Sequence, residues 1–227
     1  MKKIIKNVLV FLSYFVYADL MIIIAGGLGF NFYELSTMNR AIFLLLCNII
    51  YIVVLGFIYK DELLKDFKDF KTNYKKYIKT YLIYYMAGVL LMGLSNLIIQ
   101  ALTKTGISGN EESIRNLIEI VPLYMFFSSV IYAPFVEEMI FRKSIKNLVD
   151  KKYIFIIASG LIFGILHISD YTDINQVLLG IPYIIMGLDF AYIYYKTNNI
   201  FTTMSFHLVH NLLLYIVQIV GGLSWKN

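Results

Sequence analysis

The stretch RAIFLLLCNIIYIVVLGFIY, residues 40–59, decides the class of fold. After Arg40 it contains no charged side chain, and a helix needs about 20 such residues to cross the roughly 30 Å hydrocarbon core of a bilayer. Cys47, the single cysteine of the chain, lies inside this run. It can form neither an internal disulfide nor a cysteine cluster for a metal ion, so we expect it to be a packing residue.

The composition of the whole chain agrees with a membrane protein. Of the 227 residues, 59% are hydrophobic and 15% are charged, whereas about a quarter of the residues in a soluble domain are charged. A soluble enzyme, a disulfide-rich secreted domain and a disordered tail are therefore excluded. The net charge of +5 does not indicate nucleic acid, because the basic residues lie between apolar runs. The expected surroundings are the lipid bilayer.

Apolar runs of spanning length recur along the chain, and we interpret them as about seven transmembrane helices. With the N-terminus inside, sixteen Lys and Arg residues fall in inner segments and four in outer segments, which is a strong positive-inside bias. We therefore predict an all-α, polytopic membrane bundle with the N-terminus inside. The predicted spans are about 7–30, 40–59, 78–101, 117–141, 153–169 (which is short), 175–195 and 199–221.

Two segments outside this simple pattern have alternative interpretations. Residues 1–18 could be a cleaved signal peptide, but the apolar run continues to Phe30, which favours a retained span. Residues 60–79 combine an apolar stripe at helical spacing with many lysines, which predicts an amphipathic helix in the inner interface. The stripe consists of Leu63, Phe67, Phe70, Tyr74 and Tyr77.

A pair of glutamates at bilayer depth is the first candidate for chemistry, because ionisable groups are costly to bury there. Glu137 and Glu138 follow Pro134, which should break or kink the helix. Adjacent helical residues point about 100° apart, so the two carboxylates face different neighbours. Glu138 is four residues before Arg142, the spacing of an ion pair. Glu137 then remains as an unpaired carboxylate suited to act as a general base.

The three histidines of the chain all lie in or at the ends of its last apolar runs. His167 closes a run that contains Gly160 and Gly164, whose spacing lets another helix approach closely. His207 and Asn211 are four residues apart on one helical face and offer two donors, the arrangement that an oxyanion hole requires.

Together these residues supply a base, a second histidine and two donors from three separate helices. Each motif alone also fits a structural role. No serine or cysteine near them suggests a nucleophile, so water activated by Glu137 and His167 is the favoured nucleophile. The chemistry that this set indicates is amide hydrolysis.

The set Glu137, Glu138 and Arg142, then Phe163 with His167, then His207 with Asn211, resembles the CPBP intramembrane proteases. This family is also called the Abi or CAAX-protease family and includes relatives linked to bacteriocin immunity and peptide processing. The resemblance covers about residues 120–215. It departs from many relatives at Lys143, where those have a glycine, and at the additional His210.

The resemblance implies a protease core over residues 117–221, preceded by N-terminal helices over 1–116. It implies that Glu137 and His167 activate water, that His207 and Asn211 hold the oxyanion, and that Glu138, Arg142 and Phe163 support the site. A metalloprotease remains the alternative, with zinc bound by Glu137, His167 and His207. A glutamate-type mechanism without metal is slightly favoured.

Other functions remain open from the sequence. The first is a non-catalytic immunity or binding protein on the same scaffold. The second is a transporter with a charge pathway through Asp19, Glu119 and Asp189. The substrate is expected to be a membrane-associated peptide or a CAAX-like precursor, and the location a bacterial plasma membrane. The sequence does not give the cleavage position, any prenyl requirement, the oligomeric state, or the roles of His210, Asp19 and Asp189.

Overall fold

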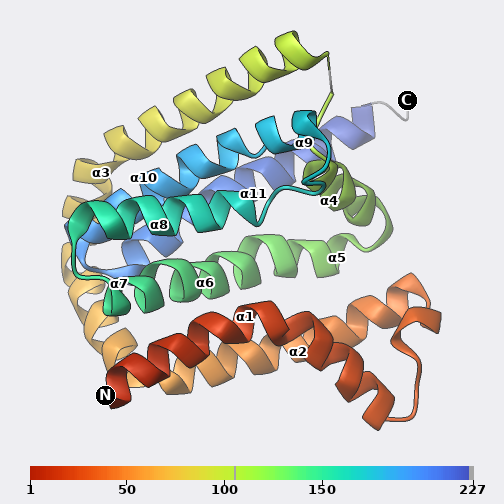
Figure 1. Cartoon of the computed structure of the whole chain (residues 1–227), viewed down its shortest axis with the longest axis horizontal. Coiled ribbons are helices and arrows are strands. Elements are labelled where there is room, and N and C mark those ends of the chain that lie inside the picture. The colour runs from red at the N-terminus through yellow and green to blue at the C-terminus, as the bar shows by residue number, and fades with distance from the viewer. Residues whose placement is uncertain (105, 225–227) are drawn as a thin grey trace.

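The computed structural model describes residues 1–104 and 106–224. This part of the chain folds into helices without a β-strand (Figure 1). In chain order the elements are α1 (Lys2–Gly27), η1 (Phe32–Glu34), α2 (Thr37–Ile58), α3 (Lys60–Thr103), α4 (Gly109–Ile120), α5 (Pro122–Met125), η2 (Phe126–Tyr132), α6 (Ala133–Glu137), η3 (Glu138–Ser144), α7 (Ile145–Leu148), α8 (Lys152–Ile165), α9 (Ile174–Leu178), α10 (Ile181–Thr197) and α11 (Ile200–Ser224).

Six helical stretches are long and apolar enough to cross a membrane, which confirms the predicted helical membrane bundle. The predicted span 153–169 is the exception: it corresponds to α8, whose 14 residues extend only about 21 Å. The six stretches are Lys2–Gly27, Thr37–Ile58, Lys60–Thr103, Pro122–Leu148, Ile174–Thr197 and Ile200–Gly221.

The predicted boundary between an interfacial helix at 60–79 and a span at 78–101 is wrong. Both belong to α3, a single helix of 44 residues, and no glycine or proline precedes Gly88 to interrupt it. Figure 1 shows its first part crossing the end of the bundle near the N-terminus and its second part running alongside the other helices. The buried residue of the first part is Asp66, not a member of the predicted apolar stripe.

The break predicted near Pro134 is also absent, because Pro122–Leu148 forms one continuous helical stretch. Proline cannot donate a backbone hydrogen bond and crowds the preceding turn. Here the surrounding turns adopt π-helical hydrogen bonding in η2 and η3, which keeps the helix intact while accommodating the proline. Glu137 consequently lies inside a continuous helix rather than at the start of a new one.

The inner segments predicted from the positive charges meet at one end of the bundle. Lys3, Lys65, Lys146 and Asn198 line one polar cavity of about 270 Å³, although they come from four separate parts of the chain. The same end carries the N-terminus in Figure 1. The helices therefore alternate in direction as the positive-inside pattern requires.

Glycines in α8 and α10 bring these two helices into close contact, as the spacing of Gly160 and Gly164 predicted. A Cβ atom on Gly160 would lie 2.6 Å from the side chain of Leu188, and one on Gly187 would lie 2.7 Å from the carbonyl oxygen of Gly160. This approach places the C-terminal end of α8, and with it His167, against α10.

Candidate active site

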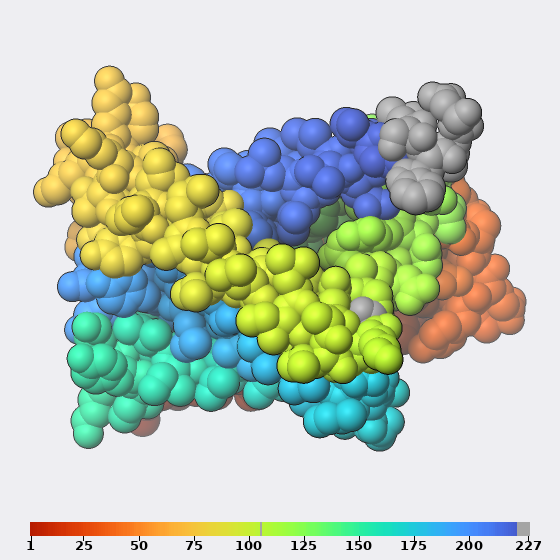
Figure 2. Space-filling model, turned by 90° about the horizontal axis from the view of Figure 1, so that it is seen from above, coloured from red at the N-terminus to blue at the C-terminus, as the bar shows by residue number. Residues whose placement is uncertain are grey.

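A cavity of about 430 Å³ lies inside the bundle and brings the predicted catalytic residues together. Its walls come from α3, α4, the Pro122–Leu148 stretch, α10, α11 and the end of α8. Figure 2 shows the molecule hollowed between the second part of α3 (yellow) and α11 (blue), where green residues are visible below. Glu137, Phe163, His167, His207 and Asn211 all line this cavity.

The ion pair predicted for Glu138 and Arg142 is present and fully buried. Arg142 Nε lies 3.4 Å from Glu138 Oε2, and both side chains are inaccessible to solvent. The Arg142 guanidinium also lies over the ring of Phe163, 4.6 Å from its centroid. A cation over an aromatic face is attracted to the ring, so this contact holds Phe163 against the buried ion pair.

His207 lies between the two glutamates and links α11 to the Pro122–Leu148 helix. Its Nδ1 is 3.0 Å from Glu138 Oε1, and its Nε2 is 3.8 Å from Glu137 Oε2. Glu138 is ion-paired with Arg142 and hence ionised, so its oxygen can only accept a hydrogen bond. His207 Nδ1 is therefore the donor in the hydrogen bond between the two side chains. The Nε2 atom of His207 then faces Glu137 and the cavity. Glu137 itself is 14% exposed, in contrast to its buried neighbour.

His167 is oriented by its own helix and by aromatic rings. Its Nδ1 is 2.8 Å from the carbonyl oxygen of Phe163, and its ring stacks on Tyr183 at a centroid distance of 4.6 Å. A carbonyl oxygen can only accept, so Nδ1 carries the proton and Nε2 of the neutral ring carries a lone pair. Phe163 therefore fixes the tautomer of His167 that a general base requires.

Asn211 is positioned by a contact that the sequence did not predict. Its Nδ2 donates to the carbonyl oxygen of Ser129, at 2.8 Å, which ties α11 to η2. An amide nitrogen has two hydrogens, so one N–H positions the side chain and the other is available to a substrate oxygen. A backbone acceptor such as the Ser129 carbonyl leaves no signal in the sequence.

The remaining predicted polar residues lie in different places. His210 lines the cavity, and its Nδ1 is 3.3 Å from the hydroxyl of Tyr85 on α3. Asp189 packs against Gly88 of α3, and its Oδ2 has no hydrogen-bond partner within residues 1–104 and 106–224. Asp19 is exposed on α1.

A zinc ion bound by Glu137, His167 and His207 would require these three side chains to surround one point. Within the described parts of the chain, no three His, Cys, Asp or Glu side chains are grouped closely enough to hold a metal ion. Glu137, His167 and His207 share a cavity without forming such a group.

Comparison with known proteins gives a partial match. Residues 119–213 match the family described as Type II CAAX prenyl endopeptidase Rce1-like. "Putative membrane peptidase YdiL" of Bacillus subtilis is 36% identical over 115 residues, which is 49% of this chain and 44% of that protein. "UPF0177 protein YvdC" of Lactococcus lactis is 27% identical over 129 residues, 56% of this chain and 48% of that protein.

The chain thus aligns with about half the length of each of these relatives, and no solved structure matches it. The matched region contains Glu137, His167, His207 and Asn211. It also contains the π-helical turns and the close contact of α8 with α10 described above. The resemblance predicted from the motifs is therefore confirmed as a similarity over residues 119–213, in a helical bundle with helices long and apolar enough to cross a membrane.

Proposed function

We propose that this protein is an intramembrane endopeptidase that hydrolyses a peptide bond of a membrane-associated peptide or CAAX-like precursor. The observation that carries the proposal is the cavity itself. The carboxylate of Glu137, the His167 ring with Nδ1 bonded to the Phe163 carbonyl, and the side chains of His207 and Asn211 come from three parts of the chain and line one space.

Glu137 is the general base in this proposal, assisted by His167. Glu137 takes a proton from water as the water oxygen attacks the carbonyl carbon of the scissile bond, and Nε2 of His167 orients that water. The tetrahedral oxyanion accepts hydrogen bonds from Asn211 Nδ2 and from His207 Nε2, which can donate only while the ring is protonated. Glu137 then returns its proton to the leaving amine as the C–N bond breaks.

The lining of the cavity supports an apolar substrate segment. Beside the catalytic set and several polar side chains, the walls include the apolar side chains of Met92, Ile114, Met125, Met186 and Phe190. Figure 2 shows a hollow between α3 and α11, and residues of both helices line the same cavity as Glu137. We expect the substrate segment to enter the cavity there. A side chain or lipid-like group buried there would fix the scissile bond relative to the base.

Cleavage of a panel of fluorogenic membrane peptides by the purified protein tests this proposal. Glu137→Gln removes the base without changing its shape, and we expect kcat to fall by about 10²–10⁴-fold. Glu112→Gln, an exposed glutamate on α4, serves as the matched control and should retain wild-type activity.

A chelator-treated wild type, with and without added zinc, tests the alternative with a metal. If Glu137→Gln loses cleavage activity and the chelator-treated wild type keeps it, the glutamate-type mechanism is supported. Loss on chelation that zinc restores would establish a metalloprotease instead. Full activity of Glu137→Gln would contradict the proposal and would favour a non-catalytic binding protein.

A further inference from the structure

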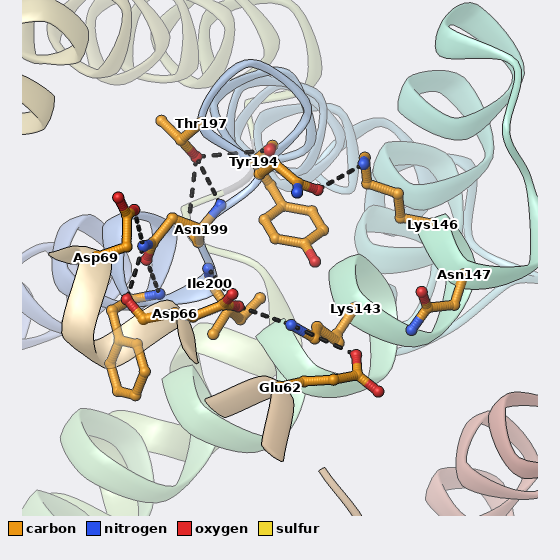
Figure 3. A network of polar contacts seen from close by, with 12 residues as sticks. Glu62, Asp66, Asp69, Lys143, Lys146, Asn147, Tyr194, Thr197, Asn199 and Ile200 are labelled. Carbon is orange, nitrogen blue, oxygen red and sulfur yellow. Dashed lines mark hydrogen bonds and ion pairs between the residues drawn. The ribbon is translucent and has the colours of Figure 1, made fainter. Parts of the chain in front are cut away.

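The carboxylate of Asp66 joins the two helices that carry the proposed catalytic residues. Its Oδ2 accepts from Nζ of Lys143, at 2.7 Å, and lies 3.5 Å from the backbone N–H of Ile200 (Figure 3). Lys143 belongs to η3, and Ile200 is the first residue of α11. One side chain of α3 therefore contacts the inner ends of both helices.

The surrounding contacts hold Asp66 and the start of α11 in one arrangement. Asn199, which is 1% exposed, donates from Nδ2 to the backbone oxygen of Asp66 at 2.8 Å and to Oδ2 of Asp69 at 2.7 Å. Tyr77 donates to the same oxygen of Asp69 at 2.6 Å. Figure 3 shows Asp66, Asp69 and Asn199 converging at this point. The start of α11 is thus fixed to α3 through side chains as well as packing.

The two anchored residues are close to the catalytic groups along their helices. Lys143 directly follows Arg142, and Ile200 precedes His207 by about two helical turns, or roughly 10 Å. A helix transmits an axial shift along its length with little loss. The contact of His207 Nδ1 with Glu138, at 3.0 Å, therefore depends on how α11 and the Pro122–Leu148 helix are held relative to each other.

A buried Lys–Asp pair is a poor source of stability alone, because the desolvation penalty of the two charges can exceed their Coulombic attraction. Lys143 is 5% exposed, and its ammonium contacts Asp66 and, at 3.6 Å, Glu62. In some proteins a buried polar or ionic pair instead selects one specific arrangement. The arrangement selected here is the register of the two catalytic helices.

We propose that Asp66 and Lys143 are positioning residues of the active site, which set His207 and Asn211 against Glu137 and Glu138 from outside the cavity. The inference rests on the proposed protease function and assigns part of it to the first half of α3. Neither residue touches the substrate in this scheme.

Steady-state cleavage kinetics test the assignment. We expect Asp66→Asn and Lys143→Met each to lower kcat at least 10-fold with KM within twofold of the wild type. Lys143→Arg, which keeps the charge and its partner, should restore kcat to within threefold. The matched controls are Asp61→Asn and Lys151→Met, which are exposed and should behave as wild type.

A double variant separates positioning from stability. Asp66→Leu with Lys143→Met removes both charges, so no unpaired charge is buried and the protein is expected to fold. Positioning predicts that kcat stays at least 10-fold low, because α11 has lost the acceptor facing Ile200. A purely structural pair predicts wild-type kcat in the folded double variant, and that result would overturn the inference.

A distance measurement makes the test independent of activity. In a Cys47→Ala background, spin labels at Ile131 and Leu208, both exposed on the two helices, report their relative position. Asp66→Asn should shift or broaden the distance distribution, and Asp61→Asn should not. An unchanged distribution would overturn the inference. If the wild type cleaves no peptide, the proposed function fails, and this measurement still decides whether Asp66 sets the register.

Discussion

Glu137 and Glu138 show how two identical neighbours acquire different properties from their surroundings. Glu138 is inaccessible and contacts both Arg142 and His207, whereas Glu137 is partly exposed on the cavity wall. The difference follows from the rotation of about 100° between consecutive helical residues. The ion pair was predictable because its members are four residues apart on one helix. The contact with His207 joins residues 69 positions apart, which only the fold brings together.

The chain contains two Glu–Arg pairs at the same spacing, one buried and one exposed. Glu138 and Arg142 are inaccessible, while Glu111 and Arg115 lie on α4 with side chains 32% and 44% exposed. We expect Arg142→Met to lower the free energy of unfolding by about 3–5 kcal/mol, because it leaves Glu138 buried without its counter-charge. Arg115→Met should change it by about 0–1 kcal/mol. Reversible unfolding in mixed detergent measures both changes in the free energy of unfolding. Equal changes in the two variants would contradict the argument that burial makes the Glu138–Arg142 pair the more important one.

A second prediction concerns Asn211, the proposed hydrogen-bond donor to the oxyanion. Removing one donor from such a site typically lowers kcat by about 10²–10³-fold. We expect this loss in Asn211→Ala with little change in KM, and no loss in Asn39→Ala, an exposed asparagine at the start of α2. A change confined to KM would assign Asn211 to substrate binding. Unfolding of the same variants shows whether the loss of the Ser129 contact also affects stability.

At the level of elements, apolar periodicity predicted which segments are helical but not where helices join. The 44-residue helix α3 was divided at 78–79 because its composition changes there from lysine-rich to apolar. Composition reports the surroundings of a helix, and the backbone continues wherever no proline, glycine or cap interrupts it. The converse holds at Pro134, which was expected to break or kink the helix: the π-helical turns around it keep the helix continuous.

The contact between α8 and α10 yields a prediction at the same scale. Gly164 lies so close to Ile184 that an added Cβ would overlap its backbone, whereas Gly56 on α2 has open space around it. We expect Gly164→Ala to destabilise the protein by about 1–3 kcal/mol and to reduce activity, since α8 carries His167. Gly56→Ala should be neutral or slightly stabilising. Thermal unfolding and peptide cleavage are the measurements, and wild-type behaviour of Gly164→Ala would contradict the packing.

For the whole molecule, the orientation in the membrane remains a prediction from the positive charges. Lys71 and Asp170 are both exposed, on the lysine-rich half of α3 and in the segment after α8. In a Cys47→Ala background, Asp170→Cys should react with a membrane-impermeant maleimide in intact cells. Lys71→Cys should react only after the membrane is opened. The opposite pattern would place the N-terminus outside.

The distribution of the catalytic groups over distant helices has a consequence for the synthesis of the protein. Glu137 and Glu138 leave the ribosome well before His207, which is translated 69 residues after Glu138. Until α11 has been inserted, Glu138 lacks its histidine and the cavity lacks a wall. A growing chain therefore lacks the complete set of proposed catalytic residues until that point. In the proposed function, insertion of α11 is therefore the step that completes the set of catalytic residues.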